Sequence, residues 1–302
     1  MNMYNYILII SLICLSQLFG ATAKPTADAA SYARLKQSLI KSLDLSPFFA
    51  ASWLRIGFHD AVTYNPADGT GGPDGSMRFS QEYNGNPKNR ALIPAILALN
   101  TLKETQFPTI SYADVFSLAS AVAVEKSNPN IKITWRPGRV DCPDFNSCGG
   151  AGVASRLPNP ELSTMKELMQ DAGARLGFND MEWALLIVGG HSIGGAPTEL
   201  RVFQPPQDSA KLSGPKWINN TITLNFKPAT PRRSTIFKTM YTADPVPPNL
   251  IRFTSDMALI RDENIKKTLI TYNDAKFETE FGNLMTRLLE VGVKSEDLGE
   301  PL

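Results

Sequence analysis

Only two histidines occur in this chain of 302 residues, and both lie in segments where an imidazole could do chemistry. The first segment places Arg55, Phe58 and His59 at positions i, i+3 and i+4. On a helix these positions share one face, so a cation, an aromatic ring and an imidazole would surround one spot. The imidazole could take a proton from a peroxide, and the cation could stabilise charge on the departing oxygen. Taken alone, the pattern fits a surface arginine and a buried structural histidine more simply.

The second histidine, His191, follows an apolar segment and lies among small residues. The nearby glycines are Gly189, Gly190, Gly194 and Gly195. They would let a flat, bulky group approach the backbone, and a neutral imidazole is the usual proximal ligand of a haem iron. A carboxylate usually orients such a ring, and Asp256 is a carboxylate in an otherwise apolar run. The alternative role for Asp256 is that of a helix N-cap.

The segment around His191 also fits a different enzyme class. Gly190, Ser192 and Gly194 satisfy the G-x-S-x-G pattern of the nucleophile elbow in α/β-hydrolases. In that fold an acid and then a histidine follow the serine along the chain, but no histidine follows His191. A secreted serine hydrolase with Ser192 as nucleophile would lack its base, so this is the least favoured alternative.

In their order and spacing, these segments resemble the plant, fungal and bacterial haem peroxidase superfamily across most of residues 30–290. The resemblance implies that Arg55, Phe58 and His59 are the distal catalytic residues. It also implies that Asn89 accepts the proton of the distal histidine, so that His59 presents its basic nitrogen to peroxide. Residues 110–116 and 135–141 match two further motifs of the family, in which Asp114 and Arg139 are expected to form a buried structural pair.

On the proximal side, the resemblance implies that His191 ligates the iron and that Asp256 is its hydrogen-bond partner. An aromatic ring flanks the proximal histidine in this family. Phe226 fits that position best and is expected to contact the cofactor, but Trp217 is close enough in sequence to compete, so both stay open.

The resemblance implies a mainly α fold with two lobes and haem b between them. The distal lobe is expected at residues 24–160, completed by 287–302, and the proximal lobe at 161–286. The implied activity is the reduction of H2O2 to water, with small phenolic or aromatic donors oxidised in one-electron steps. A haem-binding relative without catalytic activity is the alternative. The presence of Arg55, His59 and Asn89 together argues against it.

The branch within the family is predicted from the distal side. Asp60, Gly72, Asp74 and Ser76 match a distal calcium site, and such hard oxygen ligands suit one Ca²⁺ ion; a Gly/Asp-rich turn without metal is the alternative. Together with Phe58, these residues are similar to secreted fungal class II members. Residues 71–73 and the motif around Trp135 look instead like the intracellular class I branch. We therefore expect a class II-like protein with class I features.

Composition and cysteine usage bear on the compartment. The formal net charge of +1 gives no argument for a nucleic-acid partner. An apolar run at residues 7–19, followed by Ala21, Thr22 and Ala23, predicts a signal peptide at 1–23 and hence secretion. After cleavage only Cys142 and Cys148 would remain, and they could close a small loop. No further stretch is apolar enough to span a membrane, and a monomer is expected.

The pattern of apolar residues is mostly helical, and strand signals are few and short. Helices are predicted at 30–43, 48–62, 90–105, 112–126, 163–176, 180–189 and 275–292, with Ser111 as an N-cap. Two stretches, 64–76 and 203–248, are rich in residues that disfavour helices and are predicted as loops.

Overall fold

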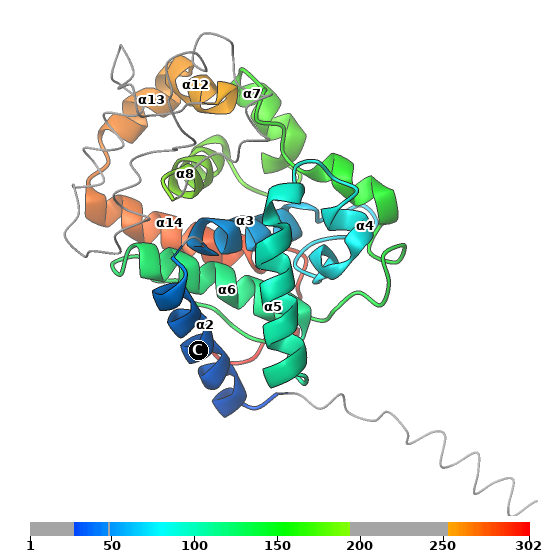
Figure 1. Ribbon diagram of the computed structural model, residues 1–302. Coiled ribbons are helices and arrows are strands. Elements are labelled where there is room, and N and C mark those ends of the chain that lie inside the picture. Colours follow the sequence, from blue (N-terminus) through cyan, green and yellow to red (C-terminus); the bar gives the residue numbers. More distant parts are fainter. Residues whose placement is uncertain (1–26, 48, 194–252) are drawn as a thin grey trace, which may run out of the picture.

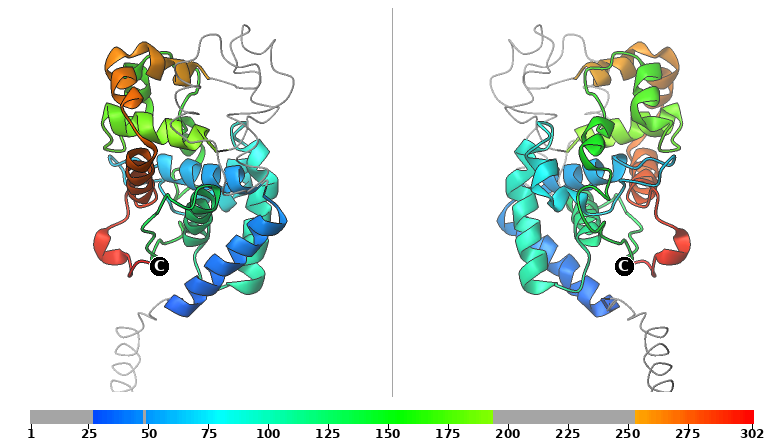
Figure 2. Two further views of the ribbon diagram at one scale, coloured as in Figure 1. Left: turned by 90° about the vertical axis from the view of Figure 1, so that its left-hand side faces the viewer. Right: turned by 90° about the vertical axis from the view of Figure 1, so that its right-hand side faces the viewer.

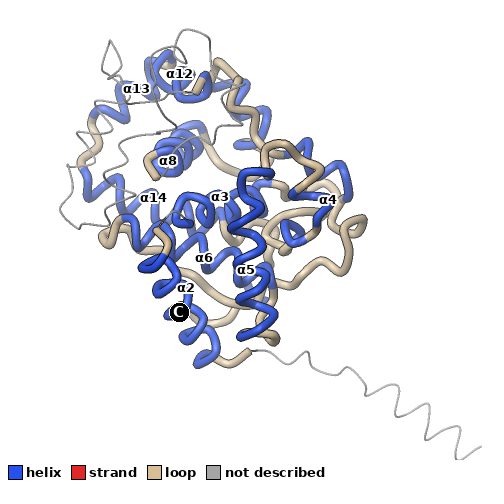
Figure 3. The backbone as a smooth tube through the Cα atoms, viewed as in Figure 1, coloured by secondary structure: helices blue, strands red, loops and turns tan. Residues whose placement is uncertain are grey.

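The computed structural model describes residues 27–47, 49–193 and 253–302 of the chain. Within these ranges it consists of helices and connecting loops, and its only extended pairing is one bridge between Asn65 and Thr70 (Figure 3). The prediction of a mainly α fold is therefore confirmed. None of the described helices is both long and apolar enough to cross a membrane.

The described α-helices are α2 (Ala29–Leu45), α3 (Phe49–Val62), α4 (Ser80–Tyr83), α5 (Ile93–Gln106), α6 (Tyr112–Ser127), α7 (Met165–Leu168), α8 (Asp180–His191), α12 (Thr254–Arg261), α13 (Glu263–Ile270) and α14 (Asp274–Leu288). Shorter turns of 3₁₀-helix are η1 (Ser76–Arg78), η2 (Arg90–Leu92), η3 (Gly150–Arg156) and η6 (Ser295–Asp297).

Most predicted helices are present. Those expected at 30–43, 48–62, 112–126 and 180–189 occur within two residues at each end. The one expected at 90–105 begins as η2 and continues as α5, whereas the one expected at 275–292 ends at Leu288. The side chain of Ser111 accepts a hydrogen bond from the backbone N–H of Asp114, so the predicted N-cap of α6 is confirmed.

The prediction of one continuous helix at 163–176 is wrong. The chain forms α7 and then a π-helical turn, η4 (Met169–Gly173). A Cβ atom on Gly173 would lie 2.6 Å from Sδ of Met169 and 3.0 Å from Cγ of Trp183. The widened turn therefore lies directly against the indole of Trp183, a tertiary contact that periodicity cannot reveal.

Two close helix contacts set the frame of the molecule. A Cβ on Gly57 of α3 would lie 2.4 Å from Cβ of Ser120 on α6, so glycine lets these two helices touch. A Cβ on Gly189 of α8 would lie 2.2 Å from the ring of Phe281 on α14. This glycine was predicted to make room for a flat cofactor, and the structure shows that it makes room for α14 instead.

Helix α8 lies between two groups of helices (Figures 1 and 2). On one side it contacts α12 and α13, with α7 packed on α12. On its other side lie α14 and α3, and α3 packs in turn on α6, which also contacts α2. The site-bearing helices α3 and α8 therefore face each other across the middle of the molecule.

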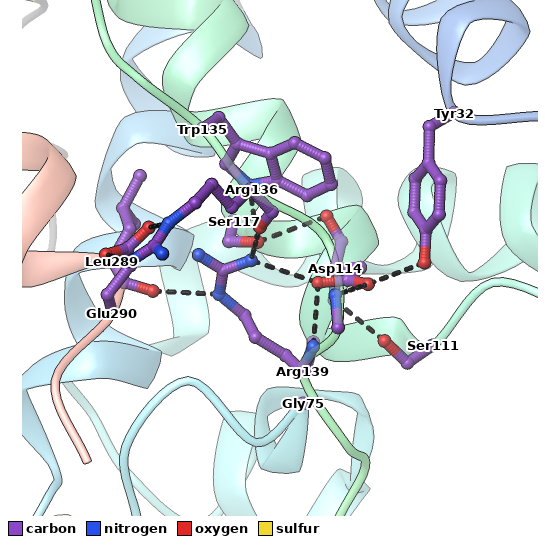
Figure 4. Close-up of polar contacts among 12 residues, drawn as sticks. Tyr32, Gly75, Ser111, Asp114, Ser117, Trp135, Arg136, Arg139, Leu289 and Glu290 are labelled. Carbon is purple, nitrogen blue, oxygen red and sulfur yellow. Dashed lines mark hydrogen bonds and ion pairs between the residues drawn. The ribbon is translucent and has the colours of Figure 1, made fainter. Parts of the chain in front are cut away.

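Asp114 and Arg139 form the buried pair expected from the sequence, with side chains only 1% and 0% exposed (Figure 4). The Asp114 carboxylate accepts hydrogen bonds from Nη1 of Arg139 (3.0 Å) and from the hydroxyl of Tyr32 (2.8 Å). Nε of Arg139 donates to the backbone oxygen of Leu289 at 2.8 Å. The pair therefore joins α2, α6 and the C-terminal segment, and the prediction that it is structural is confirmed.

Candidate active site

One cavity lies between α3 and α8, and both histidines line it. The space between its walls is about 1220 Å³, open solvent included. Its lining is mostly apolar, with a few polar groups. The lining residues include Leu54, Arg55, Phe58, His59, Lys88, Pro158, Asn159, Pro160, Asp171, Trp183, Leu186, Ile187, Gly190, His191, Ile193, Phe253 and Met285.

On the α3 side, His59 is held in one orientation by Asn89. Nδ1 of His59 lies 2.6 Å from the amide oxygen Oδ1 of Asn89. The other atom of that amide, Nδ2, faces Sδ of Met77 at 3.5 Å and the backbone oxygen of Glu82 at 3.4 Å, both acceptors. Because Oδ1 can only accept, Nδ1 of His59 must carry the proton. The lone pair of Nε2 is therefore the basic site.

Arg55 is the immediate neighbour of that basic nitrogen. Its Nε donates to Nε2 of His59 at 3.2 Å, and its Nη2 donates to the backbone oxygen of Lys88 at 2.9 Å. Arg55 and His59 therefore lie on one face of α3 and contact each other, as expected. An incoming hydroperoxide has to replace Nε of Arg55 as the donor to His59.

The electrostatic environment keeps His59 neutral. Burial and the positive charge of Arg55 hold the pKa of His59 well below its usual value of 6.5. Burial also lowers the pKa of Arg55 to about 10, which leaves it charged at neutral pH. The site thus combines a neutral base with a permanent cation.

Phe58 connects the two site-bearing helices. Its ring centre lies 6.1 Å from that of His59 and 6.1 Å from that of Trp183 on α8, with which it stacks at an interplanar angle of 29°. Trp183 is 1% exposed and lines the cavity. No sequence pattern predicts this stacking, because an aromatic residue on an apolar helix can belong to the core as readily as to a functional site.

On the α8 side, His191 is the last residue of the helix and Asp256 lies in the first turn of α12. Nδ1 of His191 lies 2.7 Å from Oδ1 of Asp256, whose side chain is 1% exposed. The other carboxylate oxygen, Oδ2, accepts from the backbone N–H of Phe253 at 2.8 Å. Asp256 therefore orients the imidazole, whereas the N-cap of α12 is Phe253, to whose backbone N–H the Asp256 side chain bonds back from the first turn.

The walls fit a flat, apolar cofactor with a histidine ligand. Among the described residues, a Cβ on Gly190 would meet no atom within 4 Å, so this part of the structure leaves the backbone beside His191 open to the cavity. With Nδ1 of His191 committed to Asp256, Nε2 is the nitrogen that would bind a haem iron. Gly194, Gly195, Trp217 and Phe226 lie outside the described residues.

The hydrolase alternative finds no support in the geometry. A nucleophile elbow lies on a sharp turn from strand to helix. Ser192 instead follows the C-terminal end of α8, where its hydroxyl donates to the backbone oxygen of Gly189 at 2.7 Å.

The residues expected to bind calcium lie together at the C-terminal end of α3 and in the loop that follows it. Asp60 is 1% exposed; its Oδ2 accepts from the backbone N–H of Gly75 (3.0 Å) and its Oδ1 from the hydroxyl of Ser76 (3.5 Å). The backbone N–H of Ser76 donates to Asp74 at 3.0 Å, and that of Asp74 donates to the oxygen of Gly72 at 2.7 Å. The oxygen atoms with which these four residues could bind a metal are thus near one another.

Glu82 is a further acid at this position that the sequence reasoning missed. It is 3% exposed, and neither carboxylate oxygen has a hydrogen-bond partner among the described residues. Burial raises the pKa of Glu82 to about 7, and the charge of Asp74 adds to this effect. Burial likewise raises the pKa of Asp74 to about 6. Two buried carboxylates and the half-buried Asp74, with Arg78 as the nearby cation, are costly to hold together, which is the condition that a divalent ion relieves.

Lys88 was also missed. Its ammonium group lines the cavity and donates to the backbone oxygens of Leu157 (2.8 Å) and Pro158 (3.1 Å). It therefore ties the segment before Asn89 to the loop at residues 157–160. A single lysine in a loop carries no signal in the sequence that would reveal this role.

Comparison with known proteins agrees with this fold. The family model described as "Peroxidase" matches residues 35–275. A mitochondrial cytochrome c peroxidase of Aspergillus fumigatus is 34% identical over 253 residues, covering 81% of this chain and 65% of the relative. One from Cryptococcus neoformans is 29% identical over 280 residues, covering 89% and 69%. A peroxisomal L-ascorbate peroxidase of rice is 28% identical over 275 residues, covering 90% and 84%.

A helical fold with a histidine on each of two facing helices defines the class as that of the haem peroxidases. The chain belongs to the peroxidase family. It is a haem-dependent oxidoreductase that acts on H2O2.

The predicted class II-like branch is corrected by these relatives. By their names they are mitochondrial cytochrome c peroxidases and a peroxisomal ascorbate peroxidase, which belong with the class I branch. The misleading features were Phe58 and the distal Gly/Asp-rich turn. Phenylalanine and tryptophan both present a flat apolar ring, and acidic turns also occur without metal, so neither feature identifies a branch.

Proposed function

We propose that this peroxidase oxidises small phenolic or aromatic donors in one-electron steps while it reduces H2O2 to water. His59 is the acid–base, Arg55 the electrostatic partner, Asn89 the residue that orients His59, and Phe58 the aromatic wall. The observation that carries the proposal is the orientation of His59: Nδ1 is bonded to Asn89, and Nε2 faces Arg55 in the cavity that also contains His191.

Haem b is the proposed cofactor, with His191 as its iron ligand through Nε2 and Asp256 as the partner of Nδ1. When bound, haem supplies a redox centre that takes both oxidising equivalents of H2O2 and passes them on to the donor. The carboxylate of Asp256 gives the imidazole ring of His191 partial negative charge, which favours higher oxidation states of the metal. Phe226 stays the proposed ring beside His191, with Trp217 as its competitor.

The proton steps follow from the distal geometry. Nε2 of His59 takes a proton from one oxygen of the peroxide, which replaces Nε of Arg55 as the donor at that nitrogen. Arg55 then faces the oxygen that is leaving with negative charge. His59 returns its proton to that oxygen, so the departing group is water rather than hydroxide.

A haem-binding relative without turnover is the alternative, and the distal residues argue against it. A carrier has no need for a neutral base beside a permanent cation, yet the pKa of His59 is lowered by burial and by Arg55. The iron ligand is tested separately, by the ferric absorption spectrum of His191→Ala. Retention of a five-coordinate histidine-ligated spectrum would show that the proximal assignment is wrong.

The donor is the finer part of the proposal. The apolar walls of the cavity are assigned to haem, so the proposed donor, a small phenolic or aromatic molecule, would approach from the mouth of the cavity. Relatives are named for cytochrome c and for ascorbate, so these two are the donors to test against. We expect guaiacol to be oxidised with a higher kcat/KM than either. A higher value for ascorbate or for reduced cytochrome c would overturn this donor assignment.

We also propose one Ca²⁺ ion at the distal side, held by Asp60, Gly72, Asp74 and Ser76. The convergence of oxygen donors and the unpartnered carboxylate of Glu82 support it. Calorimetric titration of Ca²⁺ into chelator-treated holoenzyme should show one binding event that Asp74→Asn abolishes. No heat of binding would remove calcium from the proposal.

Export, lobe division and oligomeric state are further proposals. The disulfide between Cys142 and Cys148 supports secretion, because disulfides persist mainly in oxidising compartments. Residues 1–23 are then a signal peptide, 24–160 with 287–302 a distal lobe, and 161–286 a proximal lobe. N-terminal sequencing of protein recovered from the medium should begin after Ala23, and light scattering should give a monomer. Recovery only inside cells would contradict export.

A further inference from the structure

A disulfide-closed loop lies against the turn that carries the calcium-site residues. We call residues 72–78 the distal loop. The backbone N–H of Cys142 donates to the backbone oxygen of Asp74 at 2.9 Å, and the disulfide joins Cys142 to Cys148. Both sulfurs lie within 4.8 Å of the carboxylate of Asp74, but the disulfide consumes them as metal ligands.

Arg78 fastens the two loops together. Its Nη2 donates to the backbone oxygen of Cys142, and its Nη1 donates to that of Gly75 at 2.8 Å. The guanidinium also lies 4.0 Å from the ring centre of Phe79. The side chain that ends η1 therefore holds the disulfide loop and the distal loop in one arrangement.

The distal loop in turn supports the catalytic histidine by two routes. Along the first, Gly75 donates to the carboxylate of Asp60, the residue directly after His59. Along the second, Sδ of Met77 lies 3.5 Å from the amide nitrogen of Asn89, whose oxygen bonds His59. Met77 and Asn89 are both fully buried, so a displaced loop leaves polar atoms of Asn89 without these partners.

We propose that the Cys142–Cys148 disulfide is a positioning element for His59, and that its reduction by a dithiol slows proton transfer from peroxide. The proposal rests on the proposed roles of His59 and Asn89. Reduction frees the loop that carries Cys142, Arg78 loses a fixed acceptor, and the distal loop no longer fixes the amide of Asn89. The redox state of Cys142 and Cys148, outside the cavity, thereby sets the rate of proton transfer from peroxide inside it.

The chemistry balances with a dithiol as reductant. Cys148 is 1% exposed whereas Cys142 is partly exposed, so the attacking thiolate reaches Sγ of Cys142 first. The sulfur–sulfur bond breaks and Cys148 leaves as a thiolate that takes up a proton. The second thiol of the reductant then displaces Cys142 and becomes part of a reductant disulfide. Two electrons and two protons pass to the protein, and the backbone oxygen of Asp144, 2.9 Å from Sγ of Cys148, can accept from the new thiol.

The first test is kinetic and uses haem-loaded protein in a Cys14→Ser background, where Cys142 and Cys148 are the only cysteines. The Soret change on mixing with H2O2 is compared before reduction, after anaerobic removal of the dithiol, and after reoxidation. Because partners of an orienting residue typically contribute 10–100-fold, we expect a roughly tenfold slower step that reoxidation restores. An equal rate in both states, with thiol titration confirming full reduction, would overturn the proposal.

Variants keep the test decisive if reduction loosens the whole fold. Cys142→Ser with Cys148→Ser imitates the reduced state without any reagent, and we expect the same slower step. Arg78→Met leaves the disulfide in place but removes the hydrogen bond from Arg78 to Cys142, which joins the loops, and the one to Gly75 within the distal loop. This variant should slow the peroxide step, and reducing its disulfide should then slow the step little further. The reason is that the Arg78 substitution and the reduction interrupt the same chain of contacts. Fully additive losses would show that Arg78 does not carry the coupling.

A second readout does not depend on turnover. The chain contains only two histidines, so ¹⁵N-histidine labelling gives signals that a variant of either one assigns. With zinc protoporphyrin as a diamagnetic substitute for haem, the Nδ1 proton of His59 should exchange with solvent several-fold faster after reduction. The signal of His191 serves as the internal control and should not change. If oxidised protein reacts quickly with H2O2 and only the redox effect is missing, this inference fails while the proposed function stands.

Discussion

The amide oxygen of Asn89 lies 2.6 Å from Nδ1 of His59, and this contact decides which imidazole nitrogen is basic. The amide cannot turn over without placing its NH2 group against the N–H of the imidazole. Sδ of Met77 and the backbone oxygen of Glu82 hold Nδ2 on the far side. A residue that never contacts peroxide thus prepares the base that does.

Replacing Asn89 should therefore slow the peroxide step without removing haem. Asn89→Val leaves Nδ1 of His59 without an acceptor, so the tautomer that exposes a basic Nε2 is no longer favoured. We expect a 10–100-fold slower Soret change, in the range typical of orienting residues, and about 1–3 kcal/mol less stability from unpaired buried groups. Stopped-flow absorbance and thermal unfolding measure the two effects.

The matched control is Asn130→Ala. Its amide bonds to Glu278 rather than to a residue of the cavity. It should leave the peroxide step unchanged. Equal losses in both variants would mean that the Asn89 effect is general destabilisation.

Asp256 serves the iron ligand and the start of α12 at once, and the two roles can be separated. Asp256→Asn keeps an oxygen for the backbone N–H of Phe253 but removes the charge beside His191. The reduction potential of the bound iron should rise, because a less negative imidazole stabilises the ferric state less. Spectroelectrochemistry measures this shift.

Asp262→Asn is the control for Asp256→Asn. Asp262 also bonds the first turn of a helix, as the N-cap of α13 that accepts from the backbone N–H groups of Asn264 and Ile265 at 3.0 Å. It should affect stability only. A potential that moves equally in both variants would argue against Asp256 as the partner of the ligand.

The pH dependence of the peroxide step follows from His59. Burial and Arg55 hold the pKa of His59 well below 6.5, so His59 is neutral in the folded protein at pH 6.5 and above. The rate should be constant there and fall only as pH drops through the lowered pKa. Stability follows the same sign: between the two pKa values the unfolded chain binds more protons, so His59 destabilises the fold as pH falls below 6.5. Stopped-flow rates that already halve near pH 6.5 would contradict a buried, neutral base.

When calcium is removed, we expect the buried acids to give stability the opposite dependence on pH. Burial raises the pKa of Glu82 to about 7 from an ordinary value of 4.5. Its contribution to stability is complete below pH 4.5 and is lost as pH rises through about 7. Chelator-treated protein should therefore gain stability at pH 8 from Glu82→Gln, and Ca²⁺ should reduce that gain. Thermal unfolding with and without Ca²⁺ checks both, and no gain in the chelated protein would contradict the view of Glu82 as an uncompensated charge.

Local patterns predicted the elements that carry their own signal. The apolar spacing of α2 and the Ser111 cap of α6 mark where those helices lie, and the i, i+4 spacing of Arg55 and His59 brought those two side chains together. Contacts between distant segments could not be read in this way. The stacking of Phe58 on Trp183 and the contact of Met77 with Asn89 depend on how helices and loops pack. Gly189 shows the same limit, since a glycine that permits close approach does not reveal what approaches it.

The central claim is that His59 moves the proton that allows the peroxide bond to break. The most direct measurement is rapid mixing of haem-loaded wild type and His59→Leu with H2O2 at neutral pH, following the Soret band. Wild type should change quickly, and His59→Leu should be slower by roughly 10²–10⁴-fold with its haem still bound, the loss expected for a general acid–base. If His59→Leu reacts as fast as wild type, or wild type does not react, the account is wrong.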